Sequence, residues 1–389
     1  MPHLIYGLVS MGQLLPKIPL MRPQLPAMDS LTPYLKRIDA SRHYTNFGPL
    51  QAELAEKLLA ICPRADSSSY HSICVSSCTL GLELAIAALD LPKGSKIGLP
   101  AFTFIATASA ILRCGHIPVV FDVDPSDWML KPETVEPFAS ELSAVIPVAV
   151  FGMPQDAQGW SRWSDQSGIP VIIDAAGGIG AQGLVENTTV VFSLHATKPI
   201  PAGEGGLVVT GNAQVAAKIK AMSDFGIGSI GPCLGTNAKL SEYHAAVGLA
   251  SLETWTTQSQ TRQALYRFYR ESLVQKCGAQ ASFQIDRGHV APCIFPVLLP
   301  SSEARDEVEA ACREQGIGTR RWYLPMIQHL PMLSEVQVAG SVDNADSIAS
   351  RLLGLPFYID LDTHAIEQVS SLLGHTLKLE KKFPRKNTS

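Results

Sequence analysis

The chain has 389 residues, of which 46% are hydrophobic and 17% charged, and its formal net charge is −4. A chain of this length and composition folds around a sizeable core, which excludes an intrinsically disordered protein. The slightly negative charge gives no general attraction to nucleic acid or to anionic membranes, so neither is expected as a partner.

The eight cysteines are scattered, without a CxxC pair or a histidine at zinc spacing. In so long a chain this pattern predicts reduced, mostly buried thiols and no metal site. Residues 1–21 lack a cationic start and contain three prolines, so they do not resemble a signal peptide. No window reaches the roughly 18 uncharged apolar residues that a membrane-spanning helix needs. We therefore expect a cytoplasmic protein.

In chain order, a proline-rich N-terminal arm comes first and then strands alternate with helices. The arm contains a short helix at 31–38 and leads through a turn at 44–50 into a helix at 50–61. Further helices are predicted at 79–88 and 104–114, and strands at 73–77, 96–101, 117–123, 144–150, 170–174, from 190 toward Lys198, and 207–210. Near-continuous apolar strands that alternate with helices indicate an α/β fold with a largely parallel sheet buried on both faces.

Beyond residue 210 the pattern becomes mainly helical. Helices are predicted at 212–222 and, as one long element, at 241–272. The block 280–375 combines a strand at 294–299 with helices at 302–315 and 364–373, which indicates a separate α+β lobe. The basic, polar residues 378–389 indicate a frayed, solvated tail.

Three strand ends carry residues suited to chemistry, because ligands bind at the carboxyl ends of strands in such sheets. Residues 75–81 run from a strand into a helix through small hydroxyl side chains, either as a phosphate site or as an ordinary helix cap. Asp174 ends a buried apolar strand, where its carboxylate needs a cation such as a protonated pyridine or a structural arginine. Lys198 enters a glycine-rich bend, either as a surface lysine or as an amine that forms a Schiff base.

Together the three features predict a site for pyridoxal 5′-phosphate (PLP), which needs a lysine, an acid for its pyridinium nitrogen and a phosphate cradle. A GxGxxG match at 178–183 competes with this interpretation. Only about six residues separate it from the next strand, too few for the helix of a βαβ dinucleotide site. His195, Asp156 and Asp165 show no metal-ligand spacing and are interpreted as structural.

From about residue 19 to 373 the chain resembles the DegT/DnrJ/EryC1/StrS aminotransferases. The matching segments are Ser193–Lys198 with Gly203–Gly206 (lysine motif), Asn46–Leu50 (N-terminal substrate loop), Ser76–Thr79 (phosphate turn), Pro100–Thr107 (aromatic segment), Ile173–Ala176 (aspartate motif), Gly235–Glu242 and Gly318–Tyr323. The resemblance implies PLP-dependent transferase fold type I, with a mostly parallel seven-stranded sheet between helices and a smaller α+β C-terminal domain. It divides the chain into an arm with the substrate loop (1–45), a large PLP-binding domain (46–265), a small domain (266–377) and a polar tail (378–389).

The resemblance also implies a role for each matching residue. Lys198 would hold PLP as a Schiff base, Asp174 would pair with the pyridine nitrogen, and Phe104 would stack on the ring. The cofactor phosphate would be bound by the turn that includes Cys78, and by Thr79, the backbone of Leu80, and Ser193.

A shared active site is a further implication. Asn237 would reach the cofactor phosphate of the neighbouring subunit, so a homodimer is expected. The residues expected near the nucleotide-sugar substrate are Phe47, Gly48, Arg320 and Tyr323. Two positions depart from the family pattern. Gly177 stands where a glutamine or histidine usually contacts the cofactor's ring hydroxyl, and Cys78 replaces the glycine of the phosphate turn.

The implied activity is ping-pong transamination from L-glutamate to a keto-deoxysugar nucleotide through Lys198. The segments 193–198 and 235–249 are most similar to enzymes acting at C4 of dTDP-4-keto-6-deoxyglucose. The alternatives are a 3-keto-sugar nucleotide aminotransferase and a non-catalytic PLP-binding regulatory protein, for which Gly177 is the only hint. A sugar 3-dehydratase is disfavoured because those relatives carry histidine in place of the lysine.

Overall fold

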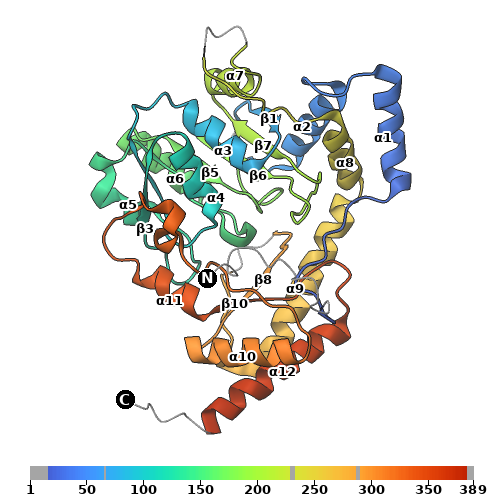
Figure 1. The fold of residues 1–389 in the computed structure, drawn as a ribbon, viewed down its shortest axis with the longest axis vertical. Helices are drawn as coiled ribbons and strands as arrows, with labels where there is room; N and C mark the ends of the chain where they lie inside the picture. The colour runs from blue at the N-terminus through green and yellow to red at the C-terminus, as the bar shows by residue number, and fades with distance from the viewer. Residues whose placement is uncertain (1–15, 65–66, 228–232, 286–289, 383–389) are drawn as a thin grey trace.

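The computed structural model describes residues 16–64, 67–227, 233–285 and 290–382 (Figure 1). A large sheet has the strand order β1-β7-β6-β5-β4-β2-β3-β9, and a small sheet pairs β10 with β8. The strands are β1 (His71–Val75), β2 (Lys96–Pro100), β3 (Ile117–Phe121), β4 (Ala144–Val145), β5 (Val171–Asp174), β6 (Thr188–Ser193), β7 (Gly206–Thr210), β8 (Phe295–Leu298), β9 (Gln337–Val338) and β10 (Leu352–Leu355). Five neighbouring pairs from β6 to β9 are parallel, and β7 runs antiparallel to both of its neighbours.

Helices cover both faces of the large sheet and build the small lobe. They are α1 (Met28–Ser41), α2 (Pro49–Ile61), α3 (Cys78–Ala87), α4 (Ile105–Arg113), α5 (Pro132–Val135), α6 (Ala157–Ser167), α7 (Ala213–Met222), α8 (Glu242–Glu253), α9 (Trp255–Cys277), α10 (Ser302–Glu314), α11 (Asp343–Arg351) and α12 (Thr363–Lys382). Figure 1 shows α9 descending from the large sheet to the lobe that contains β8, β10, α10 and α12.

Alternation along the strands separates two cores, as expected for a sheet buried on both faces. On β5, Ile172 packs in a core with α3, α4 and α7. Its neighbours Val171 and Ile173 pack in the opposite core, with α1, α2, α6 and α8. A third core, built around Phe295, joins α9, α10 and α12 in the small lobe. The predicted mostly parallel sheet and second lobe are therefore confirmed.

Several predicted elements differ in extent. The strand expected at 144–150 pairs regularly only at Ala144–Val145, because Pro147 has no N–H to donate; a single bridge between Val148 and Asp174 continues it. The helix expected at 241–272 is two helices, since Thr254 leaves helical geometry (φ −103°, ψ 2°) between α8 and α9. The sheet has eight strands rather than seven, because the short β9 adds to β3.

The C-terminal boundaries also differ from the prediction. The cut between residues 265 and 266 falls inside the continuous helix α9. Residues 378–382, expected in a frayed tail, continue α12, whose Leu373 and Leu377 are buried in the small-lobe core. Residues 383–389 of that tail lie outside the described residues. The elements α6, α11 and β10 were not predicted from the sequence.

The buried carboxylate of Glu242 caps α2 from a distant part of the chain. It accepts hydrogen bonds from the backbone N–H groups of Leu50 and Gln51, both at 2.8 Å, and is 1% exposed. The first N–H groups of a helix have no partner within it, and a carboxylate satisfies them with favourable charge. Gly48 gives the space, since a Cβ there would lie 2.5 Å from Cδ of Glu242. The contact ties the turn before α2 to α8.

We therefore predict that Glu242→Gln lowers the free energy of unfolding by about 1–3 kcal/mol, because an amide can accept only one of the two bonds and turns an NH₂ toward the other donor. Urea unfolding at fixed protein concentration measures the effect. The matched control is Glu56→Gln on the exposed face of α2, which should change stability by less than about 0.5 kcal/mol. Equal effects of the two substitutions would show that Glu242 does not act as a cap.

Candidate active site

The large sheet brings its chemically interesting strand ends to one edge. Since β7 is antiparallel to both neighbours, β1 points the same way as β6 and β5, and all three end at that edge. Val75, Gly206 and Ser193 lie side by side in the register there. The turn after β1, the residue ending β6 and the start of β7 therefore meet, as the sequence analysis expected for a site at the strand ends.

The turn after β1 offers backbone donors at the start of α3. The hydroxyl of Ser77 accepts from the N–H of Leu80 at 3.2 Å, and its carbonyl accepts from Gly81 at 3.0 Å. Leu80, whose backbone was expected to face a phosphate, is thus engaged by Ser77. The first-turn N–H groups of Cys78 and Thr79 have no acceptor within the helix and suit an anion.

Gly206 allows a close backbone approach beside this turn. A Cβ at Gly206 would lie 2.8 Å from the backbone N of Cys78 and from the carbonyl of Ser77, closer than real contacts allow. Ser193, paired with Gly206 in the register, is 4% exposed and accepts a 3.2 Å bond from the N–H of His195. Glycine at 206 thus lets the start of β7 lie directly against the backbone of the turn after β1.

Asp174 is a buried carboxylate at the end of β5, 5% exposed. It accepts hydrogen bonds from the hydroxyl of Thr107 at 2.7 Å and from the N–H of Ala176 at 3.2 Å. Burial raises its pKa above the ordinary value for aspartate, whereas these two bonds and the charge of Lys198 act to lower it. A cation placed beside Asp174 would offset the cost of burying its charge.

Lys198 lies half-buried in a tight loop between β6 and β7. Backbone bonds close the loop, from Leu194 to Gly205 and from Ala196 to Gly203, both at 2.9 Å. Gly203 has φ +84°, a conformation that favours glycine. Among the described residues, the Lys198 amine has no hydrogen-bond or ion-pair partner, so it is available to a ligand.

Electrostatics connect the three features. Burial raises the pKa of the Cys78 thiol well above its usual range; the negative charge of Asp174 raises it further and the positive charge of Lys198 lowers it. Both charges therefore act at the phosphate turn. The structure places Asp174, Ser193, Cys78 and Thr79 at one edge of the large sheet and Lys198 in the loop just beyond it. Their roles toward a cofactor stay predictions.

An aromatic cluster forms a wall of this region. Tyr323 stacks on Phe151 with ring centroids 5.6 Å apart, and lies 5.2 Å from Phe102 and 6.3 Å from Phe104. Burial raises the pKa of Tyr323, with the charge of Asp174 raising it and that of Arg320 lowering it. Phe104 stays 45% exposed, so its ring has a free face for stacking.

Gly177 packs against another backbone segment. A Cβ on Gly177 would lie 3.3 Å from the backbone of Gly152, and one on Gly152 would lie 2.6 Å from the carbonyl of Gly177. Phe151, at φ 56°, directs its ring from this bend toward Tyr323. A larger residue at 177 would need the bend at 151–152 to move, which accounts physically for glycine here.

The remaining predicted site residues contact other parts of the molecule. Arg320 places its guanidinium 4.1 Å from the ring centroid of Trp322. The ring of Phe47 lies 5.2 Å from the amine of Lys220, and Gly48 lies against Glu242. Asn237 is exposed beside Ala238, whose carbonyl accepts from the Ser76 N–H at 2.7 Å. Their roles toward substrate or a partner subunit stay predictions.

The residues of the competing interpretations make local contacts. Residues 178–183 form turns without a helix, so no dinucleotide-binding βαβ unit is present. Asp156 caps α6 by accepting from Gly159 at 2.9 Å, Asp165 accepts from Asn187 at 2.7 Å, and His195 contacts the Thr197 hydroxyl at 2.9 Å. All eight cysteines are free thiols. Within the described ranges no helix is long and apolar enough to cross a membrane.

Sequence reasoning missed the residues that hold Asp174. Thr107 reaches it from α4, and Thr103 contacts the Thr107 hydroxyl at 3.2 Å; both are 1% exposed. Their only local signal is a polar i, i+4 pair in an otherwise apolar segment.

The residues fit the three needs of PLP, because helix-start backbone donors, a buried acid and a lysine without a partner among the described residues lie at or just beyond one sheet edge. Residues 28–373, most of the chain, match the sequence model of the DegT/DnrJ/EryC1/StrS aminotransferase family. The chain belongs to the DegT/DnrJ/EryC1/StrS aminotransferase family. It is therefore assigned to the PLP-dependent nucleotide-sugar aminotransferases, and the resemblance inferred from its motifs is confirmed.

Individual members of the family align over nearly the whole chain. A dTDP-4-amino-4,6-dideoxy-D-glucose transaminase of Shigella dysenteriae is 31% identical over 90% of this chain and 97% of its own. A UDP-N-acetyl-3-dehydro-alpha-D-glucosamine 3-aminotransferase of Acidithiobacillus ferrooxidans is 30% identical over 79% and 84%. The solved structure of DesI, obtained in the presence of its TDP-sugar product, has a TM-score of 0.84 at 28% identity and covers 96% of this chain and 97% of its own.

For this aminotransferase we predict that Thr107→Val weakens PLP binding about 10-fold or more. Loss of the hydroxyl donor raises the pKa of Asp174 further and frees its carboxylate to rotate, so it pairs less well with a cation. Titration of the PLP-free protein by fluorescence quenching measures the change. Thr189→Val is the matched control, since it removes a buried hydroxyl bonded to Thr210 at 3.3 Å elsewhere in β6. Equal affinities for the two variants would contradict the positioning role of Thr107.

Proposed function

We propose that this chain transfers an amino group from L-glutamate to C4 of dTDP-4-keto-6-deoxyglucose. The observation that carries the reaction type is the placement of Lys198, whose amine has no partner among the described residues, in the loop that follows β6, next to the strand that ends in the buried carboxylate of Asp174. The choice of C4 is supported by the motif segments 193–198 and 235–249 and by the relative that forms a 4-amino-4,6-dideoxyglucose nucleotide. A 3-keto-sugar nucleotide is the second candidate, favoured by the relative that aminates a 3-dehydro sugar.

Bound PLP supplies a carbonyl carbon that carries the amino group and a ring that accepts an electron pair. The chain's own residues do the rest. The N–H groups of Cys78 and Thr79 bind the phosphate, and Asp174 holds a positive charge at the ring nitrogen. The amine of Lys198 would take and return the proton at the substrate α-carbon. Phe104 and Tyr323 shield the reacting atoms from water.

In this proposal the same site binds L-glutamate first and the keto-sugar nucleotide second, so the reaction has two half-reactions. L-glutamate leaves as its keto acid before the sugar nucleotide enters, and Lys198 handles the proton in both directions. Such ping-pong use lets each half-reaction be measured without the other substrate, which gives a direct test.

We expect that adding L-glutamate to the PLP-loaded protein converts its absorbance to that of the aminated cofactor, and that a keto-sugar nucleotide restores it. Lys198→Ala should abolish both changes, because no other described amine is placed to move the proton. Lys57→Ala, on the exposed side of α2, is the control and should behave as wild type. An unchanged spectrum with any amino donor would indicate a non-catalytic PLP-binding protein.

The substrate is tested separately, by product mass and NMR after incubation with glutamate and a panel of keto-sugar nucleotides. Amination at C4 of the dTDP sugar is expected. Exclusive amination of a 3-keto sugar would refute the C4 assignment and leave the transaminase assignment intact.

A homodimer with shared active sites is part of this proposal. The segment near Asn237 exposes large apolar side chains, with Leu234 95%, Ile227 74% and Phe225 57% exposed, which is typical of a surface covered by a partner. Asn237 would complete the phosphate site of that partner.

Subunit complementation tests the shared site. Lys198→Ala and Asn237→Ala should each lower turnover, and a mixture allowed to exchange subunits should regain activity. In a mixed dimer one site would combine the intact Lys198 of one subunit with the intact Asn237 of the other. If both residues serve the same subunit's site, no mixed dimer contains an intact site, and the mixture should stay inactive.

A further inference from the structure

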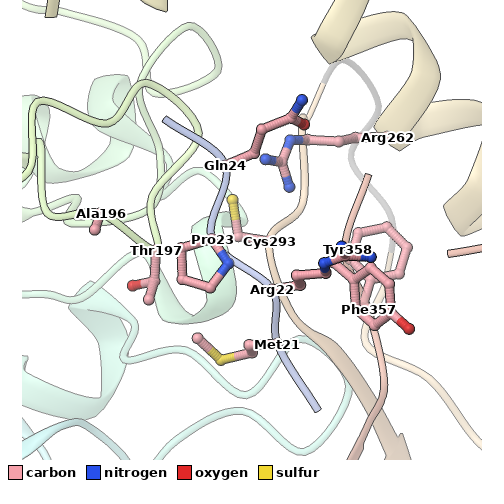
Figure 2. Close-up of a pocket in the computed structure, with 10 residues that line it drawn as sticks. All are labelled: Met21, Arg22, Pro23, Gln24, Ala196, Thr197, Arg262, Cys293, Phe357 and Tyr358. Atoms are coloured by element: carbon pink, nitrogen blue, oxygen red, sulfur yellow. The ribbon is translucent and has the colours of Figure 1, made fainter. Parts of the chain in front are cut away.

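A small cavity lies between the lysine loop, the N-terminal arm and the small lobe (Figure 2). Its empty volume is ≈ 270 Å³, part of which is open to solvent. The lining comprises Met21, Arg22, Pro23 and Gln24 of the arm, Ala196 and Thr197 of the loop, Arg262 of α9, Cys293, and Phe357 and Tyr358. The position is informative because Thr197 directly precedes Lys198.

Arg262 is a buried cation without a partner. It is 8% exposed, its Nε has no hydrogen bond, and among the described residues no ion pair or ring contact is formed by its guanidinium. Figure 2 shows the side chain reaching from α9 into the cavity, toward Gln24. The other arginine of the lining differs, because Arg22 is exposed and pairs with Asp360 at 2.7 Å. A buried guanidinium left unpaired is costly, so a ligand anion is the natural partner.

The cavity lies within the electrostatic reach of the catalytic amine. The thiol of Cys293 in the lining is affected by both Arg262 and Lys198, whose positive charges lower the pKa that burial raises. Ala196 and Thr197 line the cavity and directly precede Lys198 in the chain, so an anion bound to Arg262 would lie beside the loop that carries Lys198.

The chemistry of the lining favours a carboxylate on a short carbon chain. One unpaired guanidinium matches one negative charge, and its planar fork binds a carboxylate through two parallel hydrogen bonds. Met21, Pro23 and Phe357 offer apolar contact to methylene groups. A nucleoside diphosphate carries more negative charge than this single cation neutralises, and it is too large for the cavity to enclose.

We propose that Arg262 binds a carboxylate of the acidic amino donor and so selects that donor. The inference rests on the proposed function for the identity of the donor. Arg262 is a specificity residue for the first half-reaction and has no part in binding the sugar nucleotide.

Glutarate, a five-carbon dicarboxylate without an amine, tests the site without turnover. Isothermal titration of the full-length, PLP-loaded protein should show binding that Arg262→Gln weakens about 10- to 100-fold, the range expected for a charge-assisted bidentate bond. Arg267→Gln is the matched control, because Arg267 lies exposed on the same helix. It should bind glutarate as wild type does. dTDP should not compete with glutarate at the Arg262 cavity.

Stability separates binding from a structural role. Since the guanidinium has no protein partner, Arg262→Gln should keep or raise the thermal midpoint. Arg262→Lys keeps the positive charge but loses the planar guanidinium, so it should bind glutarate with intermediate affinity. This variant replaces Arg262→Gln in the test if Arg262→Gln does not fold. In turnover, KM for L-glutamate should rise while KM for the sugar nucleotide stays within about twofold.

Glutarate binding that is absent, or equal in Arg262→Gln and wild type, would overturn the proposal. So would competition by dTDP that depends on Arg262, or equal rises of both KM values. If wild type binds glutarate through Arg262 and yet transaminates no sugar nucleotide, the carboxylate site stands and the proposed function fails.

Discussion

The site depends on burying an ionisable carboxylate at the end of a strand that is covered on both faces. Water cannot solvate Asp174 there, and burial alone pushes its pKa upward. Thr107 and the N–H of Ala176 hold the carboxylate, and the charge of Lys198 favours its ionised form. These contacts only partly offset desolvation. The strand end thus suits a cation. A pyridinium nitrogen would meet that need, and Asp174 would keep it protonated so that the ring could accept an electron pair.

The antiparallel strand β7 brings the turn after β1 and the end of β6 together. Because β7 runs against its neighbours, its first residue lies between the end of β6 and the turn after β1. A glycine is required there, since any side chain at Gly206 would meet the backbone of Ser77 and Cys78. The same reversal forces a short connection between β6 and β7, and that connection carries Lys198. The phosphate turn and the lysine therefore share one structural cause.

Charged side chains in the scaffold and in the candidate site differ in whether they have hydrogen-bond partners within the protein. Glu242 is only 1% exposed, yet both of its carboxylate oxygens accept hydrogen bonds from backbone donors, so it stabilises the turn before α2. Lys198 and Arg262, by contrast, have no hydrogen-bond or ion-pair partner among the described residues. Lys198 lies in the loop between β6 and β7, and Arg262 lines the cavity next to Thr197 of that loop. Leaving such groups unpaired costs stability, and the cost is consistent with ligands that arrive in the catalytic cycle.

The sequence by itself determined the alternation of strands and helices over residues 50–210, the strand that ends at Asp174, and the strand-to-helix turn at 75–81, because these follow from hydrophobic periodicity and short motifs. Only the tertiary structure decided which distant groups meet them. Thr107 reaches Asp174 across a separation of 67 residues, and Arg262 enters the cavity from a helix whose pattern gives no sign of it. The break at Thr254 and the addition of β9 to β3 were also outside local patterns. Such contacts arise from packing between elements, whereas local sequence encodes only the preferences of each element.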